Sequence, residues 1–208
     1  QTRLNLGLAL HGAGRHTEAL QYFTDLQKER PDVPAPFLHA SASLLALGKA
    51  EDALAAADQA CRRAPQSPQA LFVYGQALAA LDRWPQAERA FAGALQQAPG
   101  WAEAWVECGV ARFRLGAIEG AKAAMRQALH VAPGHAVATV NLQVLMRAGA
   151  GPKSEPAPLA EPAPHPTPVR ESAADENESS VWPSRHPAMA LCLAVEYLRK
   201  KPAFARLA

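Results

Sequence analysis

Apolar residues recur along residues 1–149 at the three- and four-residue spacing of amphipathic helices. Glycine, proline and polar residues separate one apolar stretch from the next. The pattern predicts helices near residues 2–12, 16–29, 35–47, 51–63, 69–81, 85–97, 103–115, 119–131 and 137–148. The predicted fold class is therefore all-α.

A fixed interval orders these helices. The four residues that set it stand 34 residues apart and each closes a predicted helix pair: Pro31, Pro65, Pro99 and Pro133. A period of this length is typical of solenoids, in which each repeat stacks on its neighbours because it is too small to bury its own apolar face. We therefore expect any functional site to lie on a surface that several repeats share.

The repeats also share residue types at fixed offsets. Each unit carries a small residue, an alanine and a third core residue: Gly7, Ala19 and Phe23; Ser41, Ala53 and Ala57; Gly75, Ala87 and Phe91; Gly109, Ala121 and Met125. With the closing prolines, these residues resemble the tetratricopeptide repeat family. The resemblance covers residues 1–149 and implies a solenoid of helical hairpins, with about four repeats and a capping helix at 137–148.

Several of the small or special residues have structural explanations. Gly, Ser or Ala at the point where two helices cross lets their backbones approach closely. Gly48 and Gly116 fall between the helices of their units, where a residue that adopts a positive φ can end the first helix. Pro85 suits the first turn of a helix, because its missing N–H would have no partner there.

The resemblance implies that the first helix of each unit lines a concave face that binds proteins or peptides. Ten residues on this face are the candidate peptide-binding residues: Asn5, His11, His39, Phe72, Gln76, Val106, Glu107, Phe113, Arg114 and Asn141. The rest of the predicted face is largely apolar, which favours an extended or helical peptide with apolar anchors. The alternative for each apolar member is helix-to-helix packing, which is the commoner role of such residues.

Two sub-types of the family differ from this sequence at these positions. Co-chaperones that grip a C-terminal carboxylate use a basic and asparagine-rich clamp, whereas the corresponding positions here are mostly Leu, Val and Phe. Repeats that deliver substrates to a sugar transferase carry an asparagine ladder; Asn5 and Asn141 match it, but His39, Val73 and Glu107 interrupt it. Neither specialised activity is expected.

Composition narrows the possible partners. The chain has 21 basic and 19 acidic residues, and neither sign forms a long block in the repeats, so neither nucleic acid nor a membrane is an expected partner. No apolar run approaches the roughly 18–20 residues that span a bilayer. The three cysteines lack Cys-x-x-Cys spacing and are predicted to be buried thiols in a reducing compartment, which suggests a cytoplasmic location.

Candidate chemistry is sparse. The seven histidines are scattered and form no metal-binding pattern, and no cofactor-binding or nucleophile motif occurs, so residues 1–149 are predicted to be non-catalytic, without metal or cofactor. The chain starts at Gln1 within a helical pattern and is expected to be a fragment of a longer protein.

The 34-residue period ends with the helix predicted at residues 137–148. Residues 150–187 are rich in proline and then in acidic residues, which predicts a disordered linker. Residues 188–208 contain an amphipathic stretch that Pro202 ends, predicting a short C-terminal helix. This helix is expected to dock on the concave groove of the same chain, on a partner, or within a following domain.

Residues 193–207 are similar to the start of the toxin-activating lysine acyltransferase family, although no catalytic residue can be assigned from this similarity. The leading hypothesis is an interaction scaffold that binds a peptide or protein segment in its groove. The alternative is a substrate-presenting arm of a larger transferase, either acyltransferase-like or glycosyltransferase-like, whose catalytic domain lies outside this chain.

Overall fold

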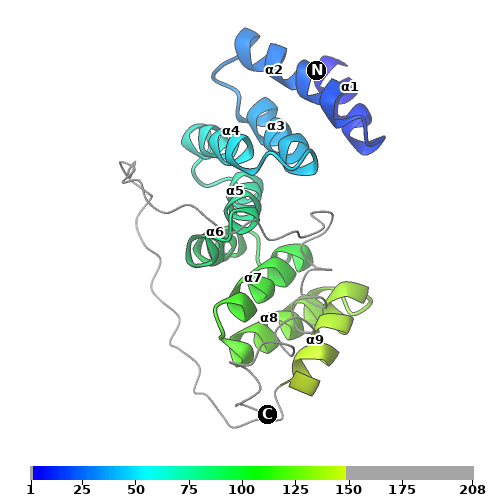
Figure 1. Cartoon of the computed structure of the whole chain (residues 1–208), viewed down its shortest axis with the longest axis vertical. Helices are drawn as coiled ribbons and strands as arrows, with labels where there is room; N and C mark the ends of the chain where they lie inside the picture. The colour runs from blue at the N-terminus through cyan, green and yellow to red at the C-terminus, as the bar shows by residue number, and fades with distance from the viewer. Residues whose placement is uncertain (1, 149–208) are drawn as a thin grey trace.

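The computed structural model describes residues 2–148, and this part of the chain is entirely helical apart from its turns (Figure 1). Its helices are α1 (Thr2–Gly12), α2 (His16–Glu29), α3 (Pro34–Ala46), α4 (Ala50–Arg63), α5 (Pro68–Ala80), α6 (Trp84–Gln97), α7 (Ala102–Arg114), α8 (Ile118–Val131) and α9 (Ala136–Ala148). Each helix predicted within residues 2–148 is confirmed. The predictions for the linker and the C-terminal tail lie outside the described residues.

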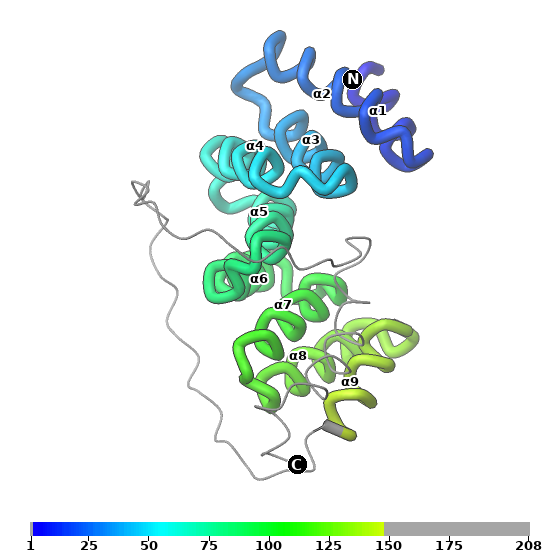
Figure 2. The backbone as a smooth tube through the Cα atoms, viewed as in Figure 1, coloured from blue at the N-terminus to red at the C-terminus, as the bar shows by residue number. Residues whose placement is uncertain are grey.

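The helices pair into antiparallel hairpins that stack one on the next (Figures 1 and 2). α1–α2, α3–α4, α5–α6 and α7–α8 are the four hairpins, and α9 packs on α8 as the first helix of a fifth unit. The solenoid runs from α1 at one end of the molecule to α9 at the other, so the two ends of the described chain do not meet. This is the predicted repeat architecture with its closing helix.

The repeated prolines mark the end of each unit. The second helices end at Glu29, Arg63, Gln97 and Val131, each two residues before a proline of the series. Each proline lies in an exposed turn. Because proline cannot donate a backbone hydrogen bond, it stops the helix and lets the chain enter the next hairpin.

Side chains of complementary size meet where the two helices of a hairpin cross. Gly7 and Gly75 lie directly against the rings of Phe23 and Phe91, and a Cβ added to either glycine would lie 2.6 Å from a ring carbon. The fourth hairpin pairs Gly109 with Met125 in the same way. These bulky partners are fully buried, so the crossing residue fixes how closely the helices approach.

In the second hairpin, different residues occupy the positions where the two helices cross. Ser41 replaces the glycine, Ala57 replaces the aromatic residue, and both are fully buried. The Ser41 hydroxyl donates a hydrogen bond of 2.8 Å to the carbonyl oxygen of Ala53, so its polar atom is satisfied inside the hairpin. A small residue therefore faces a large one in three hairpins, whereas two small residues face each other in the second.

All four hairpin turns contain one residue with positive φ at the same repeat position. Gly48 and Gly116 have φ values of 74° and 80°, which confirms their predicted role, and Gly14 at 77° does the same in the first hairpin. In the third hairpin this position is Asp82, with φ 56°. An L-residue is strained in this region, which makes Asp82 an exception with a specific cause described below.

The odd-numbered and even-numbered helices occupy different sides of the solenoid. α1, α3, α5 and α7 contact one another in succession as well as their own partners. Within residues 2–148, no comparable contacts join α2 to α4, α4 to α6 or α6 to α8. The odd-numbered helices therefore lie on the inner, more closely packed side, and the even-numbered helices spread apart on the outer side.

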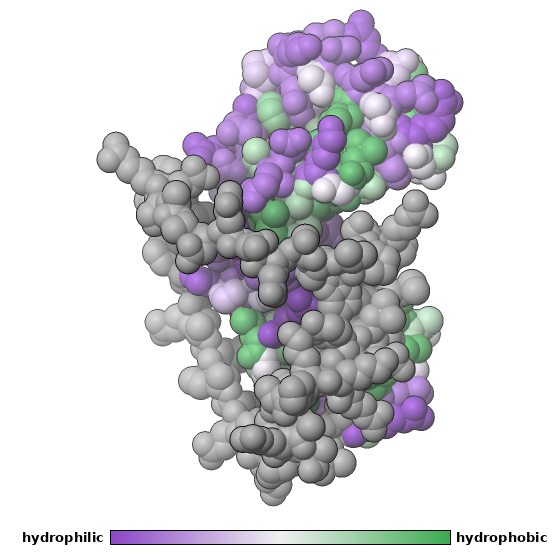
Figure 3. All heavy atoms as spheres, viewed as in Figure 1, coloured by the Kyte–Doolittle hydropathy of each residue, from purple (hydrophilic) through white to green (hydrophobic). Residues whose placement is uncertain are grey.

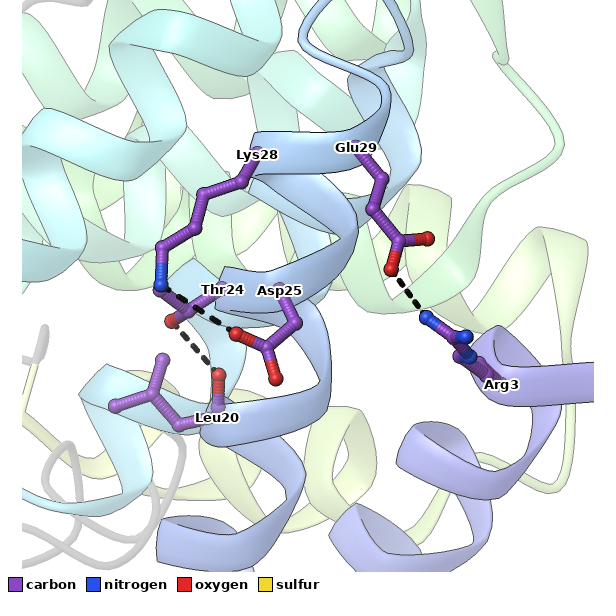
Figure 4. A network of polar contacts seen from close by, with 6 residues as sticks. All are labelled: Arg3, Leu20, Thr24, Asp25, Lys28 and Glu29. Carbon is purple, nitrogen blue, oxygen red and sulfur yellow. Dashed lines mark hydrogen bonds and ion pairs between the residues drawn. The ribbon is translucent and has the colours of Figure 1, made fainter.

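Polar contacts stabilise the outer helices locally. On α2, Lys28 forms an ion pair with Asp25 at 3.4 Å, and the Thr24 hydroxyl donates to the Leu20 carbonyl at 2.8 Å (Figure 4). Arg3 reaches across from α1 to pair with Glu29. On the view in Figure 3, the N-terminal hairpins show a mainly hydrophilic surface interrupted by a patch of apolar side chains.

Candidate functional site

The candidate site is the inner face formed by α1, α3, α5, α7 and α9. In the first two hairpins this face retains accessible aliphatic side chains, which are Leu4, Leu8, Leu38, Ala42 and Leu45. Leu8 is 37% exposed, and the candidate residue Asn5 beside it is also exposed. This part of the inner face can therefore meet a ligand without rearrangement of the helices.

The candidate histidines His11 and His39 are linked through Ser43. The Nδ1 atom of His11 lies 2.9 Å from the Ser43 hydroxyl oxygen, and that hydroxyl lies 3.0 Å from the carbonyl oxygen of His39. Because the hydroxyl has one hydrogen, His11 donates to Ser43 while Ser43 donates to the carbonyl. His16 adds a third ring, with its Nδ1 atom 3.3 Å from that of His11. This cluster joins α1, α2 and α3.

Burial and a neighbouring imidazole lower the pKa values of His11 and His39. Burial lowers the pKa of His11, and the neighbouring His16 lowers it further. Burial also lowers the pKa of His39, with His11 contributing, and the His39 ring packs 5.6 Å from the ring of Phe23. The His11 and His39 side chains are therefore neutral near pH 7 and are sensitive to acid.

In the third hairpin the aromatic candidate is part of a packed cluster. The Phe72 ring lies 4.4 Å from the Trp101 ring and 5.7 Å from the Phe91 ring, between centroids. Trp101 immediately precedes α7, so Phe72 connects the third hairpin to the fourth. Phe72 is thus half-buried and packs against the core cluster of the third and fourth hairpins.

Glu107 brings a titratable carboxyl group into this face from α7. Its side chain is buried and hydrogen-bonds to Gln76 on α5. Burial raises the pKa of Glu107 to about 7, and the hydrogen bond from Gln76 opposes this rise. These two candidate residues therefore form one polar unit, which carries part of a proton near neutral pH.

The remaining candidates of α7 separate into core and surface roles. Val106 and Phe113 are buried in a cluster that includes Met125 of α8 and Leu145 of α9. Arg114 pairs with Asp82 at 2.9 Å, and its guanidinium lies 4.4 Å above the Trp84 ring. Arg114 thus connects the fourth hairpin to the turn of the third.

Asp82 explains the strained turn of the third hairpin. One carboxylate oxygen accepts hydrogen bonds from Arg114 at 2.9 Å and from the Trp84 indole N–H at 3.0 Å. These bonds require a side chain that glycine lacks, and they offset the strain of its left-handed backbone. Sequence reasoning missed Asp82 and Trp84; the replacement of glycine by Asp at a repeated turn position was the available signal.

The last candidate, Asn141, is buried on α9, while its neighbour Val140 is 46% exposed. The structure therefore places all ten candidates on the odd-numbered helices but does not gather them into one pocket. It brings together His11 with His39 and Gln76 with Glu107. Their roles in binding remain predictions.

The same part of the chain offers little other chemistry. Within residues 2–148, no three His, Cys, Asp or Glu side chains meet in a way that could hold a metal ion. Cys61 is half-buried and Cys108 is buried, and burial raises the pKa of each thiol to about 12. None of the helices between residues 2 and 148 is long and apolar enough to cross a membrane.

The fold and the inner face define a class: a solenoid of antiparallel helical hairpins with a shared, largely apolar inner surface. Residues 2–34 and 41–102 match the family model of the tetratricopeptide repeat. The helical part of this chain therefore has the fold of a tetratricopeptide-like solenoid, and this fold supports a general role as a scaffold for protein interactions. Among curated proteins no match is found.

Solved structures give the same result. A thermophilic tetratricopeptide protein of Thermus thermophilus, TTC0263, is 27% identical, with a TM-score of 0.64 over 70% of this chain and 82% of that one. MamA of Desulfovibrio magneticus RS-1 is 21% identical, with a TM-score of 0.62 over 69% and 81%. The first tetratricopeptide domain of Spaghetti (RPAP3), bound to the HSP90 peptide SRMEEVD, is 22% identical, with a TM-score of 0.54 over 55% and 91%.

Proposed function

We propose that the inner face binds a peptide or protein segment and that the chain acts as an interaction scaffold rather than as an enzyme. The observation that carries the proposal is the row of accessible aliphatic side chains on α1 and α3, among them Leu8, Leu38 and Ala42. Aliphatic groups that line a concave surface gain free energy when an apolar ligand covers them. The peptide bound to the RPAP3 domain gives a precedent for this fold.

The chemistry of the face suggests the features of the ligand. Apolar anchors would cover Leu8 and Ala42, whereas the Gln76–Glu107 pair offers hydrogen-bonding atoms farther along the same face. The hydrogen-bonded group of His11, Ser43 and the His39 carbonyl adds polar atoms from α1 and α3. A largely apolar segment with few charges fits this arrangement better than an acidic C-terminal tail, because no basic clamp is present on the described inner face.

A matched pair of alanine substitutions tests the proposal. Ala42 is on the inner helix α3 and Ala55 is exposed on the outer helix α4, so Ala42→Glu and Ala55→Glu place the same charge on opposite sides of one hairpin. Peptides selected from a phage-displayed random library against the unmodified chain provide the ligand, and fluorescence anisotropy measures its affinity. We expect Ala42→Glu to weaken binding by about tenfold or more and Ala55→Glu to have less than about a twofold effect.

Circular dichroism of both variants establishes that they fold. Equal losses of affinity in the two folded variants would place binding elsewhere. Failure of the library to yield any peptide that competes for this face would also count against the proposal.

A further inference from the structure

Within residues 2–148, helix α9 has no second helix packed against it at a position where the first three hairpins have one. In the first three hairpins, the equivalent residues of the first helix are Leu10, Leu44 and Leu78, and each is buried in a cluster with residues of its own second helix. The residue of α9 at this position is Met146, and 58% of its surface is exposed. The side of α9 that would face a second helix is therefore uncovered in residues 2–148.

A segment near the end of the chain carries the sequence pattern of a second helix. Residues 187–202 align without gaps with residues 50–65, which form α4 and its closing proline. The identical residues pair as Ala53 with Ala190, Leu54 with Leu191, Ala57 with Ala194, Arg62 with Arg199, and Pro65 with Pro202. In α4, both aligned alanines are fully buried at the crossing with α3.

The size relation at the helix crossing supports the same pairing. The first-helix residue at the crossing is small in all four hairpins, and it faces a large residue in three of them, as in Gly75 with Phe91, and a small one in the second, Ser41 with Ala57. On α9 this position holds the larger, exposed Gln143. The position opposite it in the aligned segment is Ala194, which is small enough to leave space for the glutamine.

We propose that residues 187–202 form the second helix of a fifth hairpin by docking against α9 of the same chain. Residues 149–186 connect the two elements, and a flexible chain of that length spans roughly 35 Å on average, well beyond the distance of about 10 Å between packed helices. Such a tether gives an effective concentration in the millimolar range, which favours the same chain over a second copy. This proposal does not depend on ligand binding by the inner face.

Hydrogen exchange on the full chain tests the docking. Deletion of residues 187–208 is expected to speed exchange of the α9 amides by about tenfold, because a helix packed on one side only opens more readily. Ala194→Trp places a large side chain opposite Gln143 and should have the same effect. The matched control is Ala188→Trp, at the position of exposed Glu51 in α4, and it should leave α9 exchange unchanged.

Cysteine crosslinking identifies the docking partner. In a chain whose native cysteines are replaced by alanine, Gln143→Cys with Ala194→Cys should form an intramolecular disulfide under mild oxidation, since the proposed crossing brings their Cβ atoms close together. Ala42→Cys with Ala194→Cys tests docking on the inner face instead. A disulfide only with position 42, a disulfide-linked dimer, or unchanged α9 exchange after the deletion would each overturn the proposal.

Discussion

The crossing glycine of the third hairpin provides a quantitative test of the packing. In Gly75→Ala, the new Cβ atom would lie 2.6 Å from Cε1 and 2.8 Å from Cδ1 of Phe91. Carbon atoms in contact are normally about 3.5–4.0 Å apart, so the ring or the helix must move by roughly 1 Å. Phe91 is fully buried, and such overpacking typically costs about 1–3 kcal/mol.

The same substitution also brings a gain, which a control isolates. Alanine is more favourable than glycine inside a helix by about 1 kcal/mol. At Gly93, in α6 of the same hairpin, an added Cβ meets only Leu71 Cδ1 at 3.5 Å, an ordinary contact. Gly93→Ala should therefore stabilise the protein by about 1 kcal/mol, whereas Gly75→Ala should destabilise it by about 0–2 kcal/mol.

Urea unfolding followed by circular dichroism measures both free energies. A third variant, Phe91→Leu, removes the ring atom Cε1, and in that background the cost of Gly75→Ala should fall by about 1 kcal/mol or more. The reasoning is refuted if Gly75→Ala stabilises the protein as much as Gly93→Ala does. It is also refuted if the cost at Gly75 is the same with phenylalanine and with leucine at position 91.

Three further predictions concern charged and titratable groups. Burial raises the folded-state pKa of Glu107 to about 7, so the free energy of unfolding should fall as pH rises from about 4.5 to 7. In urea unfolding, Glu107→Gln should be more stable than the unmodified chain by up to about 3 kcal/mol near pH 8, and the two proteins should be equally stable near pH 4. The pKa values of His11 and His39 are lowered in the fold, so the unfolded chain binds protons more readily and stability should be lost as pH falls below about 6.5; thermal melts of the double Asn variant should show a weaker acid dependence. Arg112 Nε lies 3.0 Å from Glu88 Oε1, and its side chain is 17% exposed. Glu88→Ala removes this carboxylate partner and should lower the free energy of unfolding by about 1–3 kcal/mol. An unchanged melting temperature would show that the ion pair does not stabilise the fold.

The sequence was sufficient to predict the helices because the repeat supplies the same signals several times. Prolines at a constant interval, alanines at the crossing and glycines in the turns each have a local physical cause, and the predicted helix ends agree with the structure to within one residue. The inner location of the first helices also followed from the family resemblance. Each of these features recurs at a fixed position within the unit, so the repeats of a single sequence are enough to reveal it.

The individual roles of the candidate residues could not be predicted in this way. Phe72 packs against Trp101 of the next unit, and Arg114 contacts Trp84 and Asp82 of the preceding unit. Such contacts depend on how two neighbouring units stack. The repeat pattern specifies which face a residue occupies but not how deeply a neighbouring unit buries it. The cluster of His11 and Ser43 was missed for the same reason, since the two residues belong to different hairpins.

The contact pattern of the helices also has a consequence for folding kinetics. In the described chain, helices in contact are separated by one intervening helix at most, so no interaction requires the closure of a long loop. Folding rates of such low contact order usually fall in the microsecond to millisecond range, and each hairpin can serve as a nucleus from which order spreads to its neighbours. A gene that encodes this domain can therefore gain or lose a whole hairpin by duplication or deletion. The remaining hairpins still fold through contacts between residues close in sequence.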